Sequence, residues 1–238
     1  GESNAHTTFD YTYYDAALPS NQLPLILWME SERLLQLKID SNGVETQRKV
    51  VKEERRERLD NQPYGNLTEI LYSMSFQKHS YRWLPIGSSQ YIDKATLSEF
   101  EEFHKKFYVP ENGVLVVAGD IKIRETKKLI EKYFNRIPKS EKKILRERVI
   151  ETPIQKDISK TVYYNVEFPA LSYAFLTPAL GTDDYYPLIF IDLILSGGES
   201  SRLNQNLKIK NDLIINLEST YHAMEDYGLY SITCFAKS

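Results

Sequence analysis

The chain contains a single cysteine, Cys234, among 238 residues. An intramolecular disulfide is therefore excluded, which fits a cytoplasmic protein and equally a periplasmic protein that does not use disulfides. Long hydrophobic runs are also missing. The longest uncharged apolar run, from Leu23 to Met29, is far shorter than the ~20 residues needed to span a bilayer, so no membrane insertion is expected of this chain.

A basic excess is absent as well. The formal net charge is −3, whereas a dedicated nucleic-acid-binding domain normally carries a clear surplus of lysine and arginine, so nucleic acid is not an expected partner. With 42% hydrophobic and 26% charged residues, the composition is that of an ordinary globular protein. The length is sufficient for one large domain or two small ones.

Complete catalytic motifs are missing too. The four histidines form neither H-E-x-x-H nor H-x-x-E-H, so the chain holds no complete zinc motif. No G-x-S-x-G elbow occurs. The stretch S-G-G-E-S-S-R-L resembles a phosphate-binding loop but lacks the lysine of that motif, and a glycine turn followed by a serine cap accounts for it.

One helix carries a carboxylate in an unexpected place. The stretch V-V-K-E-E-R-R-E-R-L-D-N, from Val50 to Asn61, is typical of a helix. At 100° per residue, Gln47, Val50, Val51 and Glu54 all fall within roughly 60° of one direction, whereas Glu53 points toward water. Because an unpaired buried carboxylate costs several kcal/mol, Glu54 needs a partner. An arginine on a neighbouring helix and a bound metal both satisfy this requirement.

The remaining patterns predict a mixed fold. Strands are expected in the opening T-T-F-D-Y-T-Y-Y, in V-L-V-V-A-G-D (114–120), in T-V-Y-Y-N-V-E-F (161–168), and at 213–222 and 228–236. Thr96 with Glu99 predicts a capping box at a helix start. The charged, proline-bounded stretch 138–153 is interpreted as a linker. The expected class is α+β, with two related domains, 1–145 and 146–238, each a mostly antiparallel sheet covered by helices.

Five sequence blocks occur in an order that resembles the insulinase/pitrilysin family. They are the opening G-E-S-N-A-H-T-T-F-D-Y-T-Y-Y, V-V-K-E-E-R-R-E-R-L-D-N, the P-I-G loop, Y-V-P-E-N-G-V-L-V-V-A-G-D and L-S-G-G-E-S-S-R-L. This is the inverted zincin group of zinc metallopeptidases, which includes mitochondrial processing peptidase. The resemblance covers essentially the whole chain.

The resemblance implies roles for four residues and a zinc cofactor. Glu54 matches the family's third zinc ligand, and Asn4 and Ala5 match the edge strand to which substrate adds as an extra strand. The two zinc-binding histidines and the water-activating glutamate belong to an H-x-x-E-H helix, which is expected upstream of Gly1, so no catalytic residue is expected in this chain. Active members usually carry a second glutamate seven residues before the ligand, where this chain has Gln47.

The resemblance therefore implies a fragment of a zinc-dependent endopeptidase acting on extended peptides. The fragment alone, with an incomplete zinc site, is expected to be inactive. The alternative is a non-catalytic partner subunit that binds substrate or builds a chamber with an active homologue, and Gln47 raises that alternative. A peptide-binding module unrelated to proteases is a third hypothesis. The upstream sequence discriminates between the first two, because an intact H-x-x-E-H supports the enzyme.

Overall fold

The computed structural model describes residues 1–140 and 143–237, which form two compact units. The first unit is composed of Gly1–Thr7, Tyr11–Glu54 and Gly87–Arg148, and the second of Thr8–Asp10, Arg55–Ile86 and Val149–Ser238. Both units combine helices with antiparallel strands, which confirms the α+β class. The boundary near residue 145 between two homologous domains stays a prediction, because contacts define these units whereas common ancestry defines homologous domains.

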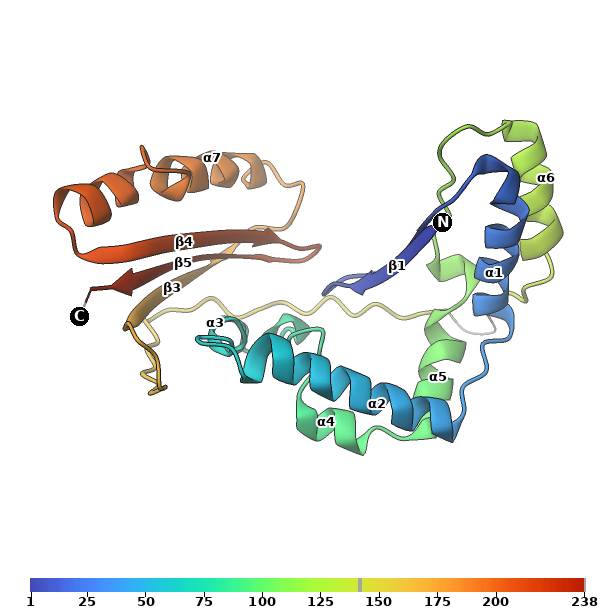
Figure 1. Cartoon of the computed structure of the whole chain (residues 1–238), viewed down its shortest axis with the longest axis horizontal. Helices are drawn as coiled ribbons and strands as arrows, with labels where there is room; N and C mark the ends of the chain where they lie inside the picture. The colour runs from blue at the N-terminus through green and yellow to red at the C-terminus, as the bar shows by residue number, and fades with distance from the viewer. Residues whose placement is uncertain (141–142, 238) are drawn as a thin grey trace. The chain divides into compact units, whose positions relative to one another are not determined.

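The first unit consists of a hairpin and several helices. Strand β1 (Glu2–Thr7) pairs with β2 (Thr12–Ala17) in antiparallel register, with Ala5 opposite Tyr14. Helix α1 (Leu23–Leu35) lies beside α6 (Ile123–Phe134) (Figure 1). The Arg136–Glu32 ion pair joins α1 to the segment after α6. The helical elements of this unit are η1 (Ser20–Gln22), α1 (Leu23–Leu35), α2 (Ser41–Arg55), α4 (Ser89–Lys94), α5 (Leu97–Phe107), η4 (Pro110–Asn112) and α6 (Ile123–Phe134).

The start of α5 confirms a local prediction from the sequence. The Thr96 hydroxyl accepts from the Glu99 amide, and the Glu99 carboxylate accepts from the Thr96 amide at 2.7 Å. These reciprocal bonds satisfy two amides that a helix N-terminus otherwise leaves without partners. The capping box therefore fixes where α5 begins.

The second unit is built around a three-stranded antiparallel sheet of β3 (Ala170–Thr177), β4 (Ile214–Ala223) and β5 (Gly228–Ala236), in the order β3-β5-β4. Helix α7 (Tyr185–Ser196) packs along β4 (Figure 1). The other elements are η2 (Arg56–Asp60), α3 (Leu67–Ser75), η3 (Ser80–Arg82) and η5 (Asn204–Lys210). The sequence patterns that predict strands at 213–222 and 228–236 are thus confirmed.

An aromatic cluster forms the core of the second unit. Phe76 is fully buried, and Tyr72, Tyr81, Met224 and Leu229 pack around it. The ring of Phe9 stacks on Tyr72, with 4.9 Å between ring centroids. Large aromatic rings dominate the energetics of a small core because each removes a large apolar area from water. Burial of this cluster fixes the loop 76–81 against the turn between β4 and β5.

Three of the predicted strands are wrong in whole or in part. Residues 8–11 form the turn between β1 and β2, where the Asp10 amide donates to Thr8 Oγ1 and Phe9 enters the core of the second unit. Residues 114–120 form no strand, and Val114 is 92% exposed. Residues 161–168 also form no strand. A strand requires a hydrogen-bonded neighbour, and neither of the last two segments has one among the described residues.

The linker predicted at 138–153 includes residues 141 and 142, which lie outside the described residues. The parts of it that the structure describes contain no helix or strand, and one residue of it, Glu151, is buried. No helix within residues 1–140 and 143–237 combines the length and the apolar character that a membrane-crossing segment requires.

Candidate functional site

Glu54 lies in the last turn of α2 and is half-buried, whereas its neighbour Glu53 is exposed. The orientation expected from the helical period, with Glu54 rather than Glu53 turned inward, is thus confirmed. The role of Glu54 as a metal ligand stays a prediction. A half-buried carboxylate agrees both with that role and with an ion pair to an arginine.

The packed side of α2 differs from the predicted stripe. Gln47 is exposed, and Val50 is 53% exposed, so these two residues do not form a buried face with Val51. The packed side follows Val44, Arg48 and Val51 instead. Arg48 Nη2 donates to the Ala95 carbonyl oxygen at 2.7 Å, and this bond explains the difference because it holds the long side chain of Arg48 against the neighbouring segment.

The helix changes its winding immediately after Glu54 and Arg55. It continues through Asp60 as a π-helix, η2. Arg55 is 7% exposed, and its Nη2 lies 2.7 Å from Glu69 Oε2. π-helical turns are rare and occur frequently at functional sites, so this junction independently marks the end of α2 as a place of interest.

The two predicted substrate-binding residues lie on β1, whose six residues are all exposed. Asn4 is opposite Asp15 and Ala5 is opposite Tyr14 in the hairpin. The Ala5 amide donates to Asn4 Oδ1 at 2.9 Å, so we infer that it points toward the outer edge of the hairpin rather than toward β2. Among the described residues, β2 is the only strand that pairs with β1.

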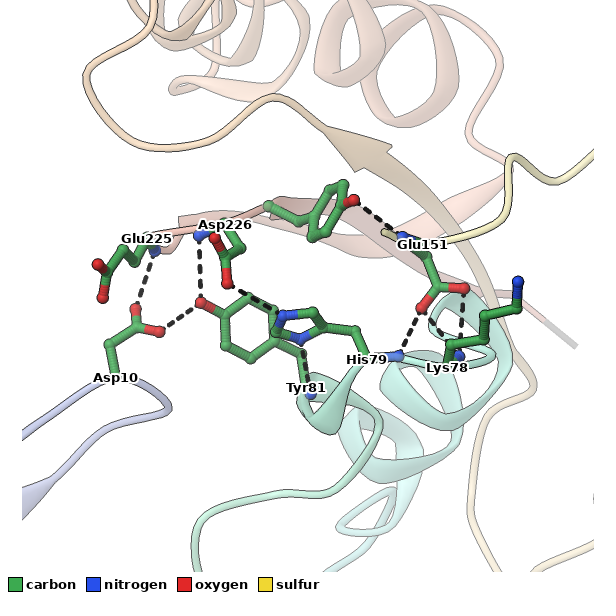
Figure 2. A network of polar contacts seen from close by, with 8 residues as sticks. Asp10, Lys78, His79, Tyr81, Glu151, Glu225 and Asp226 are labelled. Atoms are coloured by element: carbon green, nitrogen blue, oxygen red, sulfur yellow. Dashed lines mark hydrogen bonds and ion pairs between the residues drawn. The ribbon is translucent and has the colours of Figure 1, made fainter. Parts of the chain in front are cut away.

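A buried polar network that sequence reasoning missed lies in the second unit (Figure 2). His79 is 5% exposed, and its Nδ1 accepts from the Tyr81 amide at 3.2 Å. The proton of a neutral imidazole must then be on Nε2, which lies 3.2 Å from Asp226 Oδ2. The Tyr81 hydroxyl donates to Asp10 Oδ1, and Asp10 Oδ2 accepts from the Glu225 amide at 2.9 Å.

Glu151 holds the other end of this network. Its carboxylate accepts from the amides of Lys78 at 3.0 Å, His79 at 2.8 Å and Thr152 at 2.9 Å. Its own amide donates to the Tyr227 hydroxyl at 2.9 Å. Burial acts to raise the pKa of the Glu151 carboxyl, but the converging amides outweigh that effect and hold the pKa below its ordinary value. Glu151 is therefore an ionised anchor.

The described residues contain no group of three or more histidine, cysteine, aspartate or glutamate side chains that could hold a metal ion. The network around His79 is thus no alternative metal centre within that part of the chain. A catalytic zinc normally has three protein ligands and water. The carboxylate of Glu54 has the chemistry of one such ligand, so Glu54 fits as one member of a larger set.

Comparison with known proteins identifies the family. The model for insulinase (peptidase family M16) matches residues 1–83, and the model for the peptidase M16 inactive domain matches residues 94–238. The chain belongs to the M16 peptidase family. It is 29% identical over 234 residues to the zinc protease PqqE of Helicobacter pylori, covering 97% of this chain and 52% of that protein.

A further relative of the M16 chain is the mitochondrial-processing peptidase subunit beta of Lentinula edodes, with 24% identity over 96% of this chain and 51% of the relative. The fold is similar to the crystal structure of a protease from Helicobacter pylori, with a TM-score of 0.87, 28% identity, and coverage of 99% of this chain and 58% of that one. The chain thus spans about half the length of the curated relatives it matches.

Family membership confirms the resemblance drawn from the five sequence blocks. The signal missed by sequence reasoning was the K-H-S-Y stretch, in which His79 and Tyr81 enter the buried network. Glu151 gave no local signal, because its partners at Lys78 and His79 are more than seventy residues away.

Proposed function

We propose that this M16 chain supplies one zinc ligand and the substrate-binding strand of a zinc-dependent endopeptidase that cleaves extended peptides. The observation that supports it best is half-buried Glu54 beside exposed Glu53 at the junction of α2 and η2, in a chain of a peptidase family. The two zinc-binding histidines and the water-activating glutamate are proposed to lie upstream of Gly1. A bound zinc polarises the scissile carbonyl and lowers the pKa of its bound water.

The proposed role of β1 follows from its open edge. A peptide strand that adds there takes up main-chain hydrogen bonds, which give affinity for any extended sequence. The Ala5 amide is directed at Asn4 Oδ1 in the free chain. An incoming carbonyl oxygen replaces Oδ1 as the acceptor, and the Asn4 side chain is then released to bind the peptide. Asn4 and Ala5 thus act as a pair in the proposal.

The alternative proposal is a non-catalytic partner subunit. Gln47 favours it, because a neutral amide replaces the carboxylate that active relatives usually place two helical turns before the ligand. The similarity of residues 94–238 to a domain described as inactive and the relative named as a subunit agree with this alternative. In a partner subunit, β1 still binds peptide, but no hydrolysis follows.

The test is peptide hydrolysis by the whole protein that contains the proposed upstream helix. Wild type, Glu54→Gln and the matched control Glu53→Gln are compared on a quenched, unstructured peptide, with a zinc chelator as a further control. The proposal expects chelator-sensitive cleavage that Glu54→Gln abolishes and Glu53→Gln preserves, since only Glu54 is turned inward. No cleavage by wild type, together with binding of the peptide, supports the partner subunit. Equal activity of the two variants contradicts the role of Glu54.

A further inference from the structure

One side chain of the two strands β1 and β2, that of Tyr14, packs against the rest of the first unit. All six residues of β1 are exposed, and so are all residues of β2 except Tyr14, which is half-buried. Tyr14 lies directly opposite Ala5 in the hairpin register. The only inward-packed side chain of the two strands is therefore on the residue paired with the proposed peptide-binding position.

Tyr14 belongs to a closed ring of contacts among four residues, in which the Arg33 main chain takes part as well as its side chain. The Arg33 guanidinium lies 4.2 Å from the centroid of the Tyr14 ring, and the Tyr14 and Tyr108 hydroxyls are 2.6 Å apart. The His104 ring stacks on the Tyr108 ring with 4.8 Å between centroids and an angle of 16°. His104 Nε2 lies 3.0 Å from the Arg33 carbonyl oxygen, which closes the ring. It joins β2 to α1 and α5.

The charges of Tyr108 and Arg33 in this ring are fixed over the physiological range. Burial, and then the hydrogen bond with Tyr14, raise the pKa of Tyr108 to about 12, so its hydroxyl is neutral. The hydrogen bond with Glu30 raises the pKa of Arg33, so the guanidinium over the Tyr14 ring keeps its charge and makes a cation–π contact. Because the Arg33 carbonyl only accepts, His104 Nε2 carries the hydrogen, in the neutral and in the protonated imidazole alike.

We infer that Tyr14 is a positioning residue that sets the orientation of the β1 edge for peptide addition. The inference rests on the proposed function. Strand addition needs amides that point outward in a regular register. A two-stranded hairpin is marginally stable by itself, so an anchor outside the hairpin must hold that register. The hydroxyl of Tyr14 and the cation over its ring supply this anchor at the position opposite Ala5.

The test measures peptide binding to the chain itself. The probe is the acetylated and amidated heptapeptide Lys-Thr-Val-Ala-Val-Thr-Lys, titrated while the amide signals of Ser3, Ala5 and Thr7 are followed by NMR. Tyr14→Phe removes the hydroxyl and keeps the ring under Arg33. It is expected to weaken binding about fivefold, the effect of one net hydrogen bond. Tyr13→Phe is the matched control, because it makes the same change one residue away on an exposed side chain.

Tyr108→Phe removes the same hydrogen bond from its other end, so it should weaken binding to the same extent. The double variant should bind no more weakly than either single variant, because only one bond is lost. Thermal unfolding of the same variants distinguishes a merely structural role. If Tyr14 only stabilises the fold, Tyr14→Phe lowers the melting temperature and leaves the peptide affinity unchanged. Tyr14→Phe binding as tightly as Tyr13→Phe overturns the inference and leaves the proposed function intact. Absence of binding to wild type overturns both.

Discussion

Removal of the Glu151 carboxylate tests the buried network most sharply. The carboxylate accepts three amides, from Lys78, His79 and Thr152, at 2.8 to 3.0 Å. Hydrogen bonds to a charged group contribute about 1.5–3 kcal/mol, and a buried amide without an acceptor costs about 1–3 kcal/mol. Because the energies of one cluster do not add in full, Glu151→Ala should lower the free energy of unfolding of the second unit by about 3–4 kcal/mol. Glu151→Gln keeps one acceptor oxygen and should cost about half as much.

Urea denaturation followed by circular dichroism measures this loss, and amide hydrogen exchange at Lys78 and His79 locates it. The pH dependence of stability is an independent test, because the lowered pKa of Glu151 fixes its direction. The folded state holds the pKa of Glu151 below its ordinary value of 4.5, so its contribution is present above pH 4.5 and is lost as the pH falls through the lower, folded-state pKa. The difference between wild type and Glu151→Gln should therefore shrink in acid. A difference that is below about 0.5 kcal/mol at pH 7, or that grows in acid, would refute the anchoring role of Glu151.

The remaining predictions concern the core and the zinc site. Phe76→Ala should destabilise the second unit by about 3–5 kcal/mol in the same denaturation assay, because it empties a fully buried position. The chain alone should hold no stoichiometric zinc after dialysis, since one carboxylate is too few ligands; metal analysis that finds zinc lost on Glu54→Ala contradicts this. In the whole protein with an intact H-x-x-E-H, Gln47→Glu should raise zinc affinity or peptidase activity by about 10–100-fold. If Gln47→Glu raises neither zinc affinity nor activity, Gln47 adequately replaces the second glutamate of active family members.

Features set by local chemistry were predictable from the sequence. The Thr96–Glu99 capping box and the strand at Gly228–Ala236 follow from residue spacing alone, and the structure contains both. The inward turn of Glu54 followed from the helical period. By contrast, the exposed state of Val50 depends on Arg48 reaching the Ala95 carbonyl, forty-seven residues away, which no local pattern encodes.

The same limit explains the strand predicted at 114–120. Its apolar run has the composition of a buried central strand, but pairing depends on a neighbour, and none lies beside it among the described residues. Glu151 is the opposite case. A glutamate in a charged, proline-bounded stretch is normally solvated. The carboxylate of Glu151 instead accepts from the distant amides of Lys78 and His79 and from the adjacent amide of Thr152, so it is a buried anchor. Tertiary contacts decide both outcomes.

Zinc affinity tests the central claim most directly. The dissociation constant of the whole protein, with its proposed upstream helix, is to be measured by competition with a chelator for wild type, Glu54→Gln and Glu53→Gln. Mutating a residue that only hydrogen-bonds a metal ligand typically lowers metal affinity by ~10–100-fold. Loss of a residue that binds the metal directly should have a larger effect, so Glu54→Gln should weaken zinc binding by more than about 100-fold. Glu53→Gln should change it by less than about threefold, since Glu53 is exposed and the effect of its charge on a distant metal is screened by solvent and salt. Equal zinc affinities for the two variants would contradict the account.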